Sequence, residues 1–128
     1  MRPGSMKGRR ASTAMVNYRG LISANAARLR ELKARIDETF RAQPHGPAHH
    51  EACRAFHAAF DSLAFPGGLD ASMAALKTGD RQTVEVAIQY PEVAPRFFRS
   101  GYIAEEFLHR LKHVPLTCDQ VTRLVGVI

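Results

Sequence analysis

Apolar residues along the chain recur mainly with the spacing of α-helices. Over residues 17–42 they return every three or four positions, which places them on one face of a long helix. The residues of this predicted buried face are Ile22, Ala26, Leu29, Leu32, Ile36 and Phe40. The break Gln-Pro-His-Gly-Pro at residues 43–47 then separates this helix from a second one, predicted over residues 48–65.

The stretch from Asp80 to Val114 predicts two amphipathic helices joined by an apolar corner. Asp80 is a good N-cap, because its carboxylate can accept a hydrogen bond from a first-turn N–H group. Pro91 has no N–H, so we expect this helix to end near residues 89–90 or to continue to residue 93 with a kink. Ser100 is expected to cap the next helix.

Short helices flank this central stretch on either side. The first covers residues 70–78, with Asp70 as its expected cap and Gly79 as its stop. The second opens at Thr117, where Thr117 and Gln120 have the spacing of a capping box. No segment shows the alternation of a convincing strand.

These patterns predict an all-α fold of about six helices in antiparallel hairpins. The expected pairs are the first helix with the second, the third with the fourth, and the fifth with the sixth. We predict a disordered basic tail over residues 1–13 and a single all-helical domain over residues 14–128. A compact orthogonal helical bundle is the alternative arrangement.

Residues 67–127 resemble the α-α superhelix class, the HEAT- and armadillo-like helical arrays, and small bacterial proteins of that class. The resemblance is carried especially by GDRQTVEVAIQYPEVAPRFFRSGYIAEEFLHRLKHVPLT. It implies a grooved surface that binds other proteins. No regular repeat period is present in this sequence.

The net charge of +6 is concentrated near the start of the chain. Four of the 18 Lys and Arg residues stand among the first ten positions, which hold no acid, and 14 bases face 12 acids elsewhere. A solvated tail therefore explains the charge better than a nucleic-acid arm. The chain has no run of about 18 apolar residues. With two widely spaced cysteines, this predicts a cytoplasmic protein without a membrane span.

Histidines around a cysteine form the only cluster that suggests a metal site. His49, Cys53 and His57 follow one another at steps of four along the second helix, and Cys and His are typical zinc ligands. The carboxylate partners of a di-iron bundle do not recur on other helices. Surface histidines are the favoured interpretation, so we predict no metal and no cofactor. A nucleophilic pair of Cys53 with His49 or His57 ranks lower still.

Arginines and aromatics meet in the predicted corner. Arg96, Arg99 and Tyr102 surround Phe97 and Phe98, a combination that can bind phosphate or single-stranded nucleic acid. The favoured interpretation is a structural corner with buried phenylalanines and with arginines that satisfy helix-end carbonyls. Arg96, Arg99 and Tyr102 are nevertheless the candidate binding residues.

We predict a non-catalytic protein–protein interaction module, because nothing in the sequence requires an enzyme. The partner is expected to be a protein, and the apolar end at residues 124–128 also suggests self-association. A nucleic-acid-binding protein that uses the basic tail is the first alternative. A metal-binding protein that uses the His/Cys face is the second.

Overall fold

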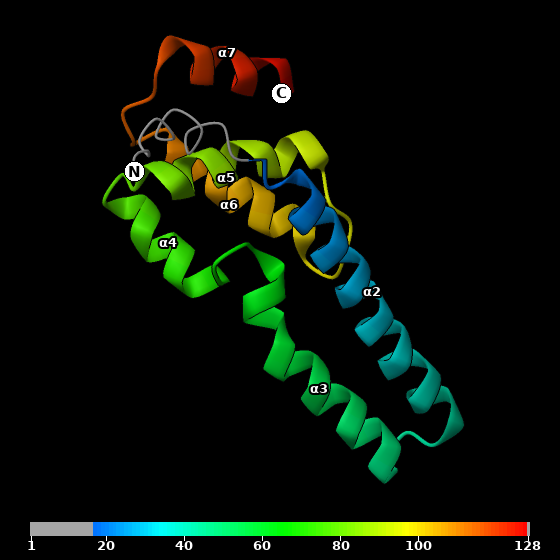
Figure 1. Ribbon diagram of the computed structural model, residues 1–128. Coiled ribbons are helices and arrows are strands. Elements are labelled where there is room, and N and C mark those ends of the chain that lie inside the picture. Colours follow the sequence, from blue (N-terminus) through cyan, green and yellow to red (C-terminus); the bar gives the residue numbers. More distant parts are fainter. Residues whose placement is uncertain (1–16, 128) are drawn as a thin grey trace, which may run out of the picture.

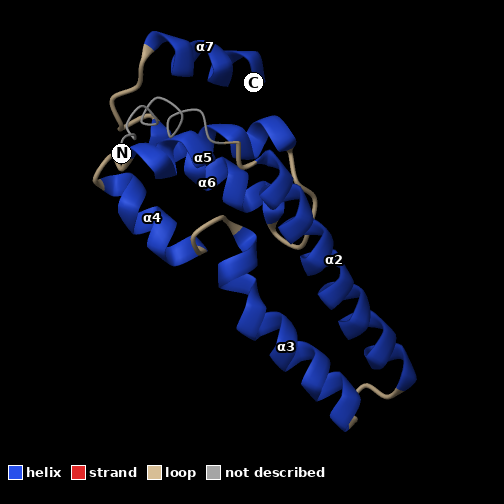
Figure 2. Ribbon diagram, in the orientation of Figure 1, coloured by secondary structure: helices blue, strands red, loops and turns tan. Residues whose placement is uncertain are grey.

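The computed structural model describes residues 17–127, and every element of regular structure within them is a helix (Figure 2), which confirms the all-α class. The predicted tail at residues 1–13 and the last residue lie outside this range. The helices are α2 (Arg19–Ala42), α3 (Pro47–Ala64), α4 (Leu69–Lys77), α5 (Arg81–Val93), α6 (Ser100–Leu111) and α7 (Cys118–Val127).

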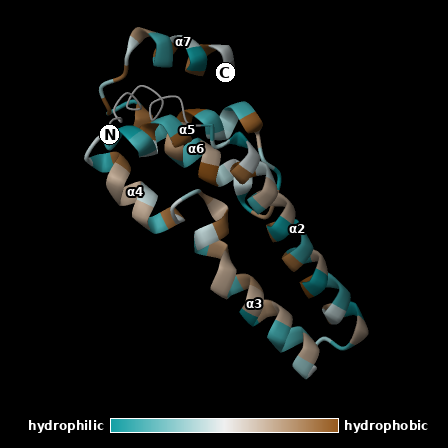
Figure 3. Ribbon diagram, in the orientation of Figure 1, coloured by the Kyte–Doolittle hydropathy of each residue, from teal (hydrophilic) through white to brown (hydrophobic). Residues whose placement is uncertain are grey.

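Helices α2 and α3 form a long hairpin, and its loop end projects away from the other helices (Figure 1). Both helices carry hydrophilic and hydrophobic residues along their length (Figure 3), as the amphipathic pattern predicts. Phe40 is an exception to the predicted buried face, because it is 53% exposed. It stands near the loop end of the hairpin, and the neighbouring Thr39 is buried instead.

Helix α5 is the centre of the fold, since it contacts α2, α4, α6 and α7. It is buried on nearly all sides, and even Gln89 is only 2% exposed. Neighbours on several sides explain why α5 continues through Pro91 to Val93, the longer of the two predicted extents. Ala94, in the left-handed conformation, then closes the helix with its N–H on the Tyr90 carbonyl (3.0 Å).

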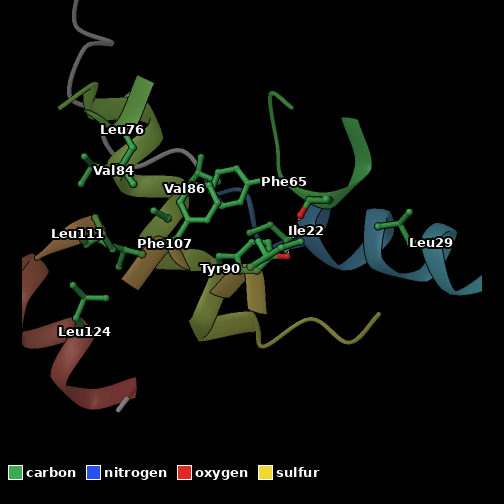
Figure 4. Packing of buried hydrophobic residues seen from close by; sticks show 14 of the residues in the cluster. Ile22, Leu29, Phe65, Leu76, Val84, Val86, Tyr90, Phe107, Leu111 and Leu124 are labelled. Carbon is green, nitrogen blue, oxygen red and sulfur yellow. Dashed lines mark hydrogen bonds between the residues drawn. The ribbon is translucent and has the colours of Figure 1, made fainter. Parts of the chain in front are cut away.

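The core is built around stacked aromatic rings between α3 and α6 (Figure 4). The Phe65 and Phe107 ring centroids lie 4.0 Å apart with an angle of 4° between the planes, and neither residue is exposed to solvent. Tyr90 also stacks against Phe65, at 5.1 Å between ring centroids, and donates its hydroxyl to the Ala64 carbonyl (3.0 Å). Burial raises the pKa of Tyr90, so this hydroxyl stays protonated as a donor.

Two of the predicted caps are confirmed and two are wrong. Asp80 caps α5, and Thr117 and Gln120 exchange both hydrogen bonds of a capping box. Ser100 instead lies inside α6, where its Oγ accepts from the Phe97 N–H (3.1 Å). Asp70 lies in the first turn of α4, and its N–H donates to Asp61 (2.9 Å). Asp61 of α3 thus takes the capping role predicted for Asp70, whereas Arg99, the N-cap residue of α6, makes no side-chain capping bond.

The expected pairing of the last two helices is also wrong. The first pair, α2 with α3, and the second, α4 with α5, are in contact as predicted. Helix α7 packs on α5 rather than forming a hairpin with α6 (Figure 1). The loop over residues 112–117 leads from the end of α6 to α7, which is anchored on α5 by the Arg123–Glu85 bond and by the buried Leu124.

Replacing Asp80 by alanine should lower the free energy of unfolding by about 1 kcal/mol. The Asp80 carboxylate accepts from both the N–H (3.0 Å) and the hydroxyl (2.8 Å) of Thr83, and alanine removes both bonds. These bonds hold the pKa of Asp80 below its ordinary value. Urea unfolding followed by circular dichroism measures the loss. Asp80→Ser keeps a capping oxygen and should recover most of it; equal losses in the two variants would argue against the cap.

Candidate functional site

The corner between α5 and α6 exposes one of its two phenylalanines. Phe97 is half-buried, with its ring 6.3 Å from that of Phe60. Phe98 is 50% exposed and touches Phe56 only edge-on, at 6.0 Å between centroids. The prediction that both phenylalanines are buried is therefore wrong for Phe98. The turn before α6 directs the two adjacent rings differently. Only the Phe97 ring packs into the helical core, and the Phe98 ring remains half exposed.

Arg96, Arg99 and Tyr102 are all exposed beside Phe98. The Arg99 guanidinium carbon lies 5.1 Å from the centre of the Tyr102 ring, a cation–π contact that holds both side chains on one surface. The backbone carbonyl of Arg96 accepts a hydrogen bond from Arg30 Nη1 (2.7 Å). A residue of α2 therefore satisfies a corner carbonyl, the role that the prediction assigned to the corner's own arginines.

We call the resulting set of residues the corner surface: Arg30, Arg96, Phe98, Arg99 and Tyr102. Sequence reasoning missed Arg30, which lies 66 residues before Arg96. The sequence did distinguish Arg30 from its neighbours on α2. Arg28 and Arg35 each pair with an acid three residues further along the helix, at 3.1 and 3.0 Å. Arg30 has no acid three or four residues away in either direction.

Arg99 is held in a conformation that side chains disfavour. Its φ of 70° and ψ of 12° lie in the left-handed region, where a residue with a Cβ costs about 1 kcal/mol or more. It occupies the N-cap position of α6 without making a side-chain capping bond. Glycine would satisfy this backbone better, so the arginine side chain is present at a conformational cost.

The predicted His/Cys group is only partly brought together. Cys53 Sγ lies 3.6 Å from His49 Nε2, whereas His57 is exposed and has its ring 6.1 Å from that of Phe56. Among residues 17–127, no three or more His, Cys, Asp or Glu side chains gather in a way that can hold a metal ion. The described side chains therefore provide the Cys53–His49 pair but not a zinc-like site.

An open groove of about 810 Å³ lies between α5, the turn before it and the start of α7. Its walls include Tyr18, Val84, Glu85, Pro115 and Gln120. A smaller hollow of about 300 Å³ shares Tyr18 and Gln82 with it, and these two side chains are hydrogen-bonded to each other. Glu85 is the acid of the larger groove, and it is already bound to Arg123. The groove is therefore a surface depression in which the one acid among the described residues is already paired, and these residues present no catalytic group.

A cluster of charges beside this groove fastens α7 to the body. Arg123 binds Glu92 through Nε (3.1 Å) and Nη2 (3.0 Å) and Glu85 through Nη1 (3.1 Å). Arg19 of α2 also reaches Glu92, at 2.6 Å. The hydrogen bond from Arg123, with that from Arg19, holds the pKa of Glu92 below its ordinary value. The sequence did not indicate this cluster, because its members come from three separate helices.

None of the helices within residues 17–127 has the length and apolar character needed to cross a bilayer. Comparison with known protein families, curated proteins and solved structures finds no match to this chain. The resemblance to HEAT- and armadillo-like arrays therefore stays a prediction.

Proposed function

We propose that the protein is a non-catalytic protein-interaction module whose docking surface is the corner surface. The observation that carries this proposal is the exposure of two aromatic rings, Phe98 (50%) and Tyr102 (55%), beside three exposed arginines. Aromatic residues and arginine are enriched where protein interfaces concentrate their binding energy.

The charge of the corner surface favours an acidic partner. Its three arginines, Arg30, Arg96 and Arg99, supply planar guanidinium groups suited to carboxylates. The nearby acid Glu106 is engaged by Arg110 of the same helix at 3.4 Å. A partner segment that combines Asp or Glu with one apolar side chain matches these groups, because the apolar side chain can cover Phe98 and Tyr102.

The conformational cost at Arg99 supports the same surface. A residue kept in an unfavourable backbone conformation, where glycine would be more stable, suggests that its side chain has a use. Its contact with the exposed Tyr102 ring positions the guanidinium without burying it. The Arg99–Tyr102 contact and the Arg30–Arg96 bond thus hold the corner in a conformation that presents these side chains together.

Selection from a random peptide display library tests this function. The protein should enrich peptides that contain Asp or Glu next to an apolar anchor, and Tyr102→Ala or Arg99→Gly should weaken their binding about tenfold or more. Arg99→Gly should keep the free energy of unfolding within about 1 kcal/mol of the original, because relief of strain offsets the added chain entropy. Fluorescence anisotropy and urea unfolding measure the two quantities.

Arg54→Ala is the matched control, since Arg54 is also exposed but belongs to α3 and pairs with Glu51 (2.6 Å). It should leave peptide affinity unchanged. Selection of peptides without acids, or equal losses from Arg54→Ala and Arg99→Gly, would contradict the proposal.

A second candidate function is binding of single-stranded nucleic acid by the same surface, because bases can stack on exposed aromatic rings between arginines. A fluorescent oligothymidylate at about 50 mM salt distinguishes the two functions. Tight binding that is lost in Tyr102→Ala and weakens steeply with salt would favour nucleic acid over the acidic peptide. We also propose, from the two free cysteines, that the protein acts in the reducing cytoplasm.

A further inference from the structure

Three side chains form a hydrogen-bonded chain across the α2–α3 hairpin. Thr39 Oγ1 on α2 lies 3.1 Å from Nδ1 of His49 on α3. The other ring nitrogen of His49, Nε2, lies 3.6 Å from Sγ of Cys53, one helical turn further along α3. Thr39 is buried, whereas His49 and Cys53 are half-buried.

The bonding of Thr39 determines which nitrogen of His49 carries the proton. The Thr39 hydroxyl has one hydrogen, and it points to the Arg35 and Ile36 carbonyls, at 2.8 and 3.1 Å. Thr39 Oγ1 can therefore only accept from His49, which places the ring proton on Nδ1. Nε2 then presents its lone pair to the Cys53 thiol. The imidazole is thus oriented as a base toward the sulfur, with Thr39 as the positioning residue.

We propose that Cys53 is a reactive thiol, a modification site for small peroxides, with His49 as the base that activates it. The inference rests on this geometry and is independent of the proposed function. Nε2 takes the thiol proton, and the thiolate attacks one peroxide oxygen. The S–O bond forms as the O–O bond breaks, so that sulfur is oxidised by two electrons to a sulfenic acid and the peroxide is reduced. The leaving hydroxide takes the proton from His49 and departs as water.

The surroundings of the thiol favour a small reagent. Cys53 is only half-buried, so that solvent reaches it, but Phe40 packs against the His49 ring at 5.4 Å between centroids. Hydrogen peroxide or a small alkyl hydroperoxide can reach the sulfur, whereas a bulky thiol such as glutathione would collide with the Phe40 and His49 side chains. Of the three predicted ligands, His49 and Cys53 therefore act together in a different chemistry, and His57 takes no part.

The test uses the full chain with Cys118→Ser, because Cys118 is exposed at the first turn of α7, where a helix N-terminus can itself activate a thiol. Treatment with hydrogen peroxide and then dimedone, followed by mass spectrometry, should label Cys53. The rate of alkylation by iodoacetamide at pH 7 should fall about tenfold or more on addition of His49→Gln. Thr39→Val should also slow it, and Thr39→Ser, which keeps the hydroxyl, should restore the original rate.

Thermal unfolding of each variant shows whether the hairpin is retained. Unfolding would expose Cys53 and speed its alkylation. Slower alkylation of a His49→Gln variant that stays folded would therefore result from loss of the base and not from loss of structure. An unchanged rate in His49→Gln, or the absence of a dimedone adduct at Cys53 in the parent, would overturn the proposal. Equal alkylation rates for Thr39→Val and Thr39→Ser would show that Thr39 does not position His49.

Discussion

Phe107→Ala should lower the free energy of unfolding by about 3–5 kcal/mol, the largest effect that we expect from a single substitution in this chain. Phe107 is fully buried and stacks on Phe65 at 4.0 Å, in the middle of the core that joins α3, α5 and α6. Alanine removes most of these contacts and leaves a cavity that rigid helices cannot close. Urea unfolding monitored by circular dichroism measures the loss.

Val125→Ala provides the comparison, because Val125 is 67% exposed on α7. It should change the stability by no more than about 0.5 kcal/mol. A loss below about 1 kcal/mol in Phe107→Ala would mean that the stacked pair does not form the centre of the core.

Arg123→Met should lower the free energy of unfolding by about 2 kcal/mol and release α7 from α5. Arg123 is 24% exposed and binds two acids that are 16% and 20% exposed, so the loss lies between those of surface and fully buried ion pairs. Methionine keeps the packing of the side-chain stem but leaves Glu85 and Glu92 without their common cation. Hydrogen exchange should report faster opening of the amides over residues 118–127.

Arg28→Ala is the matched control, because it removes an exposed arginine that pairs with Glu31 at 3.1 Å. It should cost about 0.5 kcal/mol or less. Equal effects of Arg28→Ala and Arg123→Met would show that the charge cluster does not anchor α7.

Lowering the pH should remove the stabilisation that the Arg123–Glu85–Glu92 cluster gives to the folded protein. The pKa of Glu92 in the folded protein lies below its ordinary value of 4.5, so the unfolded chain binds the proton more readily. The stabilisation is therefore fully present above pH 4.5 and disappears as the pH falls through the lower folded value. Arg123→Met should flatten the fall in stability below about pH 5, because the dominant cause of the pKa shift is then missing.

The two proposed functions use different side chains. The corner surface depends on α2, α5 and α6, whereas the Cys53 thiol depends only on the α2–α3 hairpin. Phe98 connects them through its edge contact with Phe56, one turn beyond Cys53 on α3. Peptide binding and thiol reactivity can therefore be tested in separate variants, and the failure of one leaves the other standing.

Local chemistry was sufficient for the parts of the fold that neighbours in sequence control. Helical periodicity identified the all-α class, and the caps at Asp80 and at Thr117–Gln120 depend on groups three residues apart. The same reasoning failed for Asp70, whose N–H is bound by Asp61 of α3, and for Ser100, which is the first residue of α6 rather than its N-cap. The bond to Asp61 could not be predicted from local pattern, because it joins α4 to a different helix.

Periodicity and local chemistry were enough to predict amphipathic helices, most of their bounds, and the meeting of arginines and aromatics at the α5–α6 corner. Packing between helices, in contrast, sets which side chains at that corner stay exposed and which histidine faces Cys53. It also determines that α7 rests on α5 through Arg123. The difference lies in how far apart along the chain the interacting groups stand. Helical periods and caps act over three or four residues, whereas Arg30–Arg96 and Arg123–Glu85 join groups 66 and 38 residues apart.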